Sequence, residues 1–197
     1  HRHLSRALIS LMENDLSLVK HVEQFANLLS NCSSMTTLAV RASCIVDASG
    51  TYLSRLVTQN RLTLVNLDLS WNKFTATFAE ESLAPVLPLC EQLTELNLSN
   101  NSLREEGFIA IVDGVVKGTT QLRTLDLSGN GVVPIIQSTK SAPIIQSIIK
   151  LQVLTSLRHL KFLDFHWTEQ SILRLSRSLA CVDPTVEFEE TNVARGN

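Results

Sequence analysis

A short phrase recurs along this chain at a constant interval. It reads L-x-x-L-x-L-x-x-N, and it begins at Leu64, at Leu93 and at Leu122, 29 residues apart. A fixed period of this length indicates that each repeat is one supersecondary unit, which buries its apolar face only by stacking on its neighbours. The sequence therefore predicts a row of stacked units, which offers a surface for binding rather than an enclosed pocket.

Weaker copies of the phrase lie on both sides of these three. Counting backwards by the same period gives units that begin at Met35 and near Arg6. Counting forwards, the period is interrupted by two copies of Pro-Ile-Ile-Gln-Ser, at 134–138 and 143–147, nine residues apart. A nine-residue duplication places the next unit at Leu160, and a short terminal unit is expected near residue 183, with Val186 and Phe188 on a last strand.

The phrase divides each unit into a strand and a helical half. The L-x-L step alternates apolar and polar residues, which is typical of a short strand with one buried face. The second half of each unit carries apolar residues at steps of three and four, which predicts a helix. Pro85 and Pro88 are expected to shorten or kink one of these helices. The expected helices span 16–29, 52–58, 78–89, 106–116, 144–154 and 169–179.

The ninth position of the phrase holds a side chain that can bond to the backbone. An asparagine amide both donates and accepts, so it can satisfy peptide groups left over where the strand bends. Serine or threonine can do part of this work. The residues expected in this structural role are Asn14, Ser43, Asn72, Asn101, Asn130 and Thr168.

These repeats resemble the leucine-rich repeat family, and their length resembles its ribonuclease-inhibitor-like class. The resemblance covers roughly residues 6–190 and is most specific between Leu64 and Asn130. It implies one α/β domain over 1–197: a short horseshoe arc of about six repeats, with parallel strands on the concave face and helices on the convex face. The first repeat has no obvious polar cap, so we expect the chain to be a fragment or subunit of something larger.

The polar residues between the leucines are the candidate partner-binding residues on the concave face. Three aspartates and two tryptophans stand out, because aspartates suit a basic partner and exposed tryptophans act as anchors in interfaces. The alternative is that a polar residue is required at these positions whatever binds there. The candidates are Arg41, Asp68, Trp71, Asn97, Asp126, Asp164, His166 and Trp167.

Composition narrows the kinds of partner. The formal net charge is -2, which gives no electrostatic basis for binding nucleic acid. A run of about 18 apolar residues, as a membrane span needs, does not occur in the sequence. The four cysteines form no C-x-x-C pair, and free thiols fit a reducing compartment, so we expect an intracellular protein, in the cytoplasm or an organelle.

The sequence shows no constellation of catalytic residues, metal ligands or cofactor-binding motifs, so we expect neither enzymatic activity nor a cofactor. The leading hypothesis is a module that binds a partner protein or other subunits of a complex. Two alternatives stay open by resemblance to proteins with this repeat class. One is a regulator of a small GTPase of the Ran GTPase-activating type, for which Arg41 and Arg123 are exposed candidates. The other is the ligand-sensing repeat domain of a nucleotide-binding innate-immune receptor.

Overall fold

The computed structural model describes residues 7–119, 121–132, 142–162 and 187–188. In these residues one parallel sheet runs the length of the molecule, and its strands follow one another in chain order. They are β1 (Ala7–Ser10), β2 (Met35–Ala39), β3 (Asn66–Asp68), β4 (Glu95–Asn97), β5 (Thr124–Asp126), β6 (His159–Lys161) and β7 (Glu187–Phe188). Each unit therefore stacks directly on the next.

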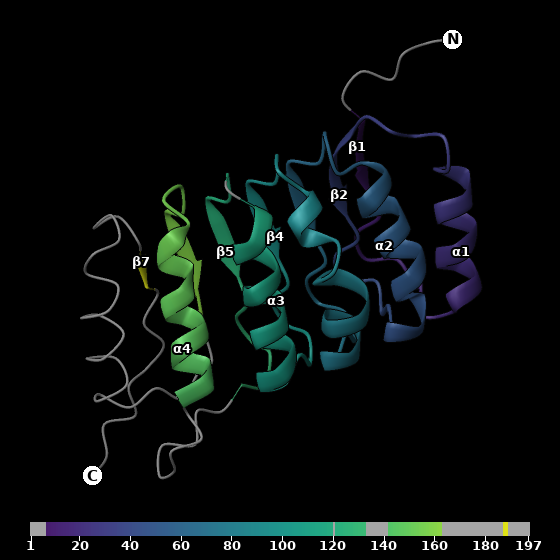
Figure 1. Ribbon diagram of the computed structural model, residues 1–197. Coiled ribbons are helices and arrows are strands. Elements are labelled where there is room, and N and C mark those ends of the chain that lie inside the picture. Colours follow the sequence, from purple (N-terminus) through teal and green to yellow (C-terminus); the bar gives the residue numbers. More distant parts are fainter. Residues whose placement is uncertain (1–6, 120, 133–141, 163–186, 189–197) are drawn as a thin grey trace.

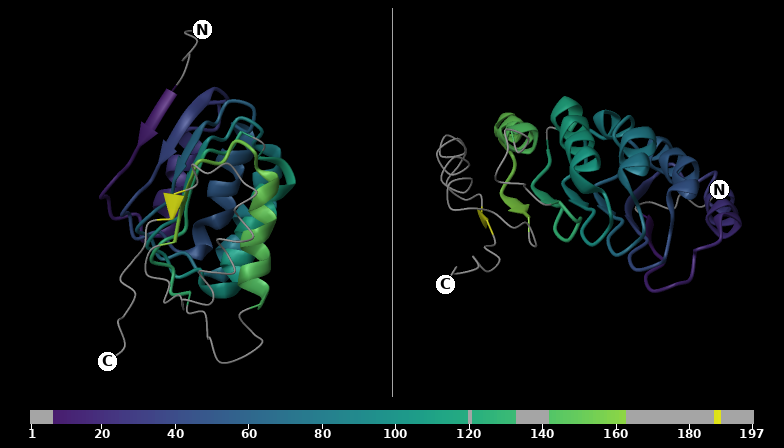
Figure 2. Two further views of the ribbon diagram at one scale, coloured as in Figure 1. Left: turned by 90° about the vertical axis from the view of Figure 1, so that its left-hand side faces the viewer. Right: turned by 90° about the horizontal axis from the view of Figure 1, so that it is seen from below.

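The return segments cover one face of this sheet. They are α1 (Val19–Leu28), η1 (Asp47–Ser49), α2 (Gly50–Gln59), η2 (Phe78–Leu83), η3 (Leu87–Leu89), α3 (Arg104–Gly118), α4 (Ala142–Lys150) and η5 (Leu151–Val153). Figure 1 shows them side by side, and the right-hand view of Figure 2 shows that they lie on the outer side of an arc whose strands line the inner side. The predicted α/β solenoid, with concave strands and convex helices, is confirmed.

The helical segments follow the expected positions, with one break. Where a helix was expected over 78–89, the chain makes a π-helical turn, η2, and then a 3-10 turn, η3. Pro85 and Pro88 explain the break, because a proline has no N–H to donate and its ring clashes with the preceding turn. The helix expected over 169–179 lies outside the described residues.

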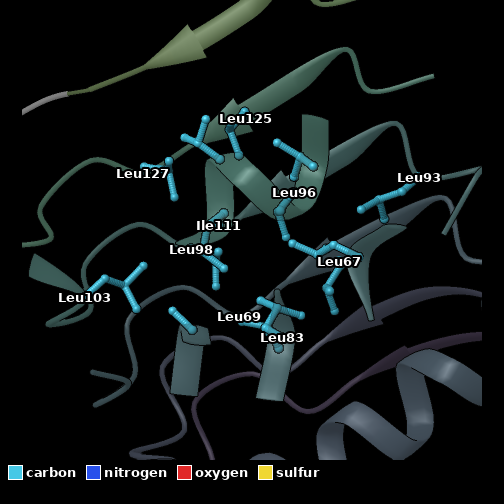
Figure 3. Close-up of a cluster of buried hydrophobic side chains, with 14 of the residues drawn as sticks. Leu67, Leu69, Leu83, Leu93, Leu96, Leu98, Leu103, Ile111, Leu125 and Leu127 are labelled. Carbon is cyan, nitrogen blue, oxygen red and sulfur yellow. The ribbon is translucent and has the colours of Figure 1, made fainter. Parts of the chain in front are cut away.

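The leucines of the phrase form the core between the two layers. The fourth and sixth positions of the three central units are fully buried, and Ile111 and Leu83 cover them from the helical side. Figure 3 shows these side chains converging from both layers; the leucines at the two positions are Leu67, Leu69, Leu96, Leu98, Leu125 and Leu127. Burying one such side chain contributes about 1.5–3 kcal/mol, so the repeated phrase is the main source of stability.

The asparagines of the ninth position tie each unit to the one before it. The Asn101 amide donates to the Leu69 carbonyl of the preceding unit at 3.1 Å and to Leu98 of its own unit at 3.0 Å. Its Oδ1 accepts from the Phe74 N–H, again in the preceding unit, at 3.1 Å. Asn72 and Asn130 repeat this arrangement.

The two remaining ninth-position residues in the described part of the chain depart from this arrangement. Ser43 takes over the donor part, since its hydroxyl donates to the Leu11 carbonyl at 2.7 Å. Asn14 is exposed, and its amide reaches only the Met12 carbonyl of its own turn, at 3.1 Å. Thr168 lies outside the described residues.

The sixth unit begins three residues earlier than predicted. Leu160 pairs with Leu125, and Lys161 pairs with Asp126, so the first position of this unit is Leu157 rather than Leu160. The prediction failed because leucines at 157, 160 and 163 fill the first and fourth positions of the phrase in either register, while Thr168 suits the ninth position only in the later one. Parallel pairing with β5 and packing of the Phe162 ring on Phe108, 5.3 Å apart, select the earlier one.

Of the two Pro-Ile-Ile-Gln-Ser copies, one lies within the described residues. The second copy, 143–147, forms the start of α4, where Ile144 and Ile145 are buried. The first copy, 134–138, lies outside the described residues. The buried isoleucines show that the second copy is used as core.

Candidate interaction surface

The last residue of each of the first six strands presents its side chain on the concave face. The pairing places these residues in a single row across the sheet, which is Ser10, Ala39, Asp68, Asn97, Asp126 and Lys161. The first five occupy the expected positions. Lys161 takes the place that was predicted for Asp164, so the acidic row ends in a basic residue. Asp164, His166 and Trp167 lie outside the described residues, and their predicted positions rested on the rejected register.

The acidic residues of this row have a structural task in their own strands. Asp68 Oδ1 accepts from the Ser70 N–H at 3.0 Å and from its hydroxyl at 2.6 Å. Asp126 Oδ1 accepts from the Ser128 N–H at 3.0 Å. Such bonds to the residue two positions later fix the chain where a strand ends. The recurring D-x-S motif is therefore explained by these local hydrogen bonds, and it does not by itself require a basic partner.

Trp71 differs from these aspartates, because it has no such local hydrogen bond within the described residues. Its side chain is 54% exposed, and the indole has no hydrogen bond or ring contact within the described part of the chain. It stands immediately beyond β3, on the rim of the concave face, with the exposed Arg41 on the neighbouring unit. A large exposed aromatic side chain of this kind is a typical anchor of a protein interface.

The backbone at Trp71 strengthens this interpretation. The eighth position of the first five units adopts a left-handed conformation, with φ between 53° and 64°, at Glu13, Ala42, Trp71, Asn100 and Gly129. Glycine and asparagine tolerate this region, whereas a bulky residue there costs about 1–2 kcal/mol. Trp71 therefore occupies a position where the fold itself favours a smaller residue, which points to a role other than stability.

A second concave row lies two residues before the first and was not singled out from the sequence. Because side chains two apart in a strand share a face, the third position of each phrase also points to the concave side. In this row the Asn66 amide donates to Glu95 Oε2 at 2.5 Å. The full row is Leu8, Thr37, Asn66, Glu95, Thr124 and His159. The alternation of side chains along each strand is the sequence signal that would have predicted this second row.

The two arginine candidates lie at opposite ends of their strands. Arg41 follows β2, whereas Arg123 precedes β5, and both are exposed. A shallow hollow of about 290 Å³ lies on the convex side, lined by Glu80, Ala84, Pro85, Ala110, Asp113, Gly114 and Lys117.

The residues that the structure describes contain no cluster of three or more His, Cys, Asp or Glu side chains that could hold a metal ion.

Comparison with known proteins agrees with this architecture. Residues 92–112 match the family model described as Leucine Rich Repeat. Over 94% of its length the chain superposes on the crystal structure of an internalin from Listeria monocytogenes, with a TM-score of 0.51 and 17% sequence identity. The alignment covers 48% of the internalin, so the chain spans about half the length of that protein. A search of curated protein sequences returned no match.

Taken with the sheet topology, these findings identify the fold as a leucine-rich-repeat solenoid. The search for membrane spans is negative over the described ranges: none of their helices combines the length and the apolar character that crossing a bilayer requires.

Proposed function

We propose that this leucine-rich-repeat solenoid is a protein-interaction module that binds a partner protein on its concave face and has no catalytic activity of its own. The observation that carries the proposal is Trp71. It is a half-exposed indole that makes no hydrogen bond or ring contact with the described residues, held in a backbone conformation that disfavours it, on the rim of an open sheet. We also assign the repeats, by their length, to the ribonuclease-inhibitor-like class.

The partner engages the middle of the arc in this proposal. Trp71 supplies the apolar anchor, and the two concave rows beside it supply polar groups around Asp68, Asn97 and Glu95. Asp68 Oδ2 and the Glu95 carboxylate favour a partner, or a neighbouring subunit of a complex, that brings basic side chains to this part of the sheet. Arg41 and Asp126 complete the proposed contact residues within the described part of the chain, and Asp164, His166 and Trp167 are retained in the proposal from their place in the sequence alone.

The decisive variant is Trp71→Asn. Asn100 occupies the same position one unit later with the same backbone conformation, φ 56° against 57°, so the substitution removes the indole and keeps the turn. Val153→Asn is the matched control, because Val153 is 57% exposed and lies on the helical side of the arc. Both variants should remain folded by circular dichroism.

The experiment captures partners from a cell lysate with the native chain and with both variants, and quantifies them by mass spectrometry. A direct partner should bind the native chain and Val153→Asn equally, and its affinity for Trp71→Asn should fall about 30-fold or more, as for a hot-spot residue. A partner that binds all three proteins with one affinity would place the interface away from the concave rim and refute the proposal.

Two narrower functions use the same fold. A regulator of a small GTPase would present an arginine to the nucleotide, and the exposed Arg41 is the candidate on the same rim as Trp71. Following phosphate release from a loaded GTPase with the native chain and with Arg41→Ala tests this function directly. A ligand-sensing domain of an innate-immune receptor would retain binding on the concave face without accelerating phosphate release.

We propose an intracellular setting for either function. Cys32, Cys44 and Cys90 are all free thiols in the structure, which suits a reducing compartment.

A further inference from the structure

The first unit of the arc exposes a surface that every later unit buries. Ile9, Leu11 and Leu16 are only partly buried, whereas the residues 29 positions later, Leu38, Val40 and Ile45, are fully buried. The same three positions are again fully buried in the unit after that, at Leu67, Leu69 and Phe74. The difference arises because, among the described strands, β1 has a neighbour on one side only, so that its other edge lacks the unit-to-unit contact.

The backbone at this edge has the donor and acceptor pattern of an internal contact. Within the arc, each unit donates N–H groups to carbonyls of the next unit at fixed positions. Leu11 donates to Ala39, Glu13 to Arg41, and Leu16 to Ser43, at 2.8–2.9 Å. The carbonyls at the corresponding positions of the first unit are those of Ser10, Met12 and Asn14, and among the described residues no strand lies on the side of β1 from which backbone N–H groups would reach them.

Asn14 provides the most specific observation. In three later units the ninth-position amide donates to the sixth-position carbonyl of the preceding unit: Asn72 to Val40, Asn101 to Leu69 and Asn130 to Leu98. The same asparagines accept an N–H from the eleventh position of that preceding unit. Asn14 carries the same side chain at the same position, but it is exposed and bonds only to its own turn. Asn14 therefore makes the local bond of the later asparagines, to the carbonyl two residues earlier, without their bonds to a preceding unit.

From these matches we infer that the β1 edge is an interface for one further leucine-rich-repeat unit, stacked in parallel register, and that Asn14 is the residue that fastens it. The occupant is thus a strand of L-x-L pattern backed by a helix, placed as residues 35–63 are placed against the unit that follows them. Its sixth-position carbonyl receives the Asn14 amide, and its eleventh-position N–H donates to Asn14 Oδ1. Its apolar residues cover Ile9, Leu11 and Leu16.

The test supplies such a unit from the chain itself. A copy of residues 35–63 is inserted between Ser5 and Arg6, which keeps the 29-residue period. The matched control carries the same copy with Thr37 and Leu38 exchanged and with Ala39 and Val40 exchanged, so that its apolar strand residues slip by one residue and present the wrong face. Both proteins are then compared with the native chain by thermal unfolding, and each is also made with Asn14→Ala.

In-register insertion should raise the midpoint of thermal unfolding above those of the native chain and of the slipped control. Asn14→Ala should change the native midpoint by less than about 2 °C, because the side chain is exposed there, and should lower the midpoint of the in-register protein by about 4 °C or more. The difference between the two backgrounds is the signature of a bond across the new contact, which a general effect of the substitution on the turn would not produce.

Three outcomes would overturn the inference. In-register and slipped insertions could have the same midpoint, or Asn14→Ala could have the same effect in the native and extended chains. The third is a stable dimer of the native chain in sedimentation equilibrium that Leu8→Asp dissociates, since a second copy would then be the occupant of this edge.

Discussion

Replacing Asn101 by alanine tests the role assigned to the buried asparagines, and the structure allows its magnitude to be worked out atom by atom. The carbonyls of Leu69 and Leu98 each keep a second partner, from Asn72 and Asn130 respectively. The Phe74 N–H, in contrast, loses the side-chain oxygen to which it donates and is left in the core. One orphaned buried N–H costs about 1–3 kcal/mol, and the weakened carbonyl bonds add about 1 kcal/mol.

We therefore expect Asn101→Ala to lower the free energy of unfolding by about 2–4 kcal/mol, measured by urea unfolding followed with circular dichroism. Asn101→Ser should recover part of this loss, since Ser43 shows that a hydroxyl can reach the carbonyl of the preceding unit. Asn14→Ala is the control and should cost less than about 0.5 kcal/mol, because Asn14 is exposed. Equal losses for Asn101→Ala and Asn14→Ala would refute the reasoning.

Two further predictions concern packing and pH. Gly118→Ala should destabilise the fold by about 2–3 kcal/mol in the same urea assay, because the new Cβ would lie 2.1 Å from the Pro88 carbonyl oxygen. Gly131→Ala is the control and should cost less, because no atom lies within 4 Å of its new Cβ and only the backbone φ of 66° opposes the substitution. Burial raises the pKa of the Cys90 thiol to about 11, from an ordinary value of 9.0. The stability that this shift represents is fully present below about pH 9 and is lost as the pH rises through about 11, because the unfolded thiol ionises first. The urea midpoint should therefore fall less steeply over that range in Cys90→Ala than in the native chain, and identical slopes would contradict the assignment.

Much of the fold follows from local pattern. The 29-residue spacing of Leu64, Leu93 and Leu122 predicts the stacked units. The alternation within each strand predicts which side chains are buried, because successive residues of a strand point to opposite faces. Pro85 and Pro88 predict the broken helix for an equally local reason, since proline lacks the N–H that a helix needs. The concave row from Ser10 to Asp126, at the fifth position of the phrase, was predicted on the same basis and is found in that register.

The candidate site was predicted less completely, because its distinguishing features are not local. The sequence places Trp71 on the rim, but its left-handed backbone and uncovered indole emerge only when the neighbouring units are in place. Likewise, the serine that occupies one oxygen of Asp68 reduces the significance of the carboxylate as a partner-binding group. Both points depend on distances between atoms that a pattern of residue types does not contain.

The sequence by itself determined the repeating unit, the sheet order and the polar character of the concave face, because each depends on residue spacing within one unit. Only the tertiary structure decided the register of β6, since the leucines at 157, 160 and 163 allow two registers and Thr168 at the ninth position favours the later one. Pairing with β5 and the contact of Phe162 with Phe108 separate them. Tertiary structure also decided which asparagines are tied across units and which one, Asn14, is not, because that bond needs a neighbour that no single repeat encodes.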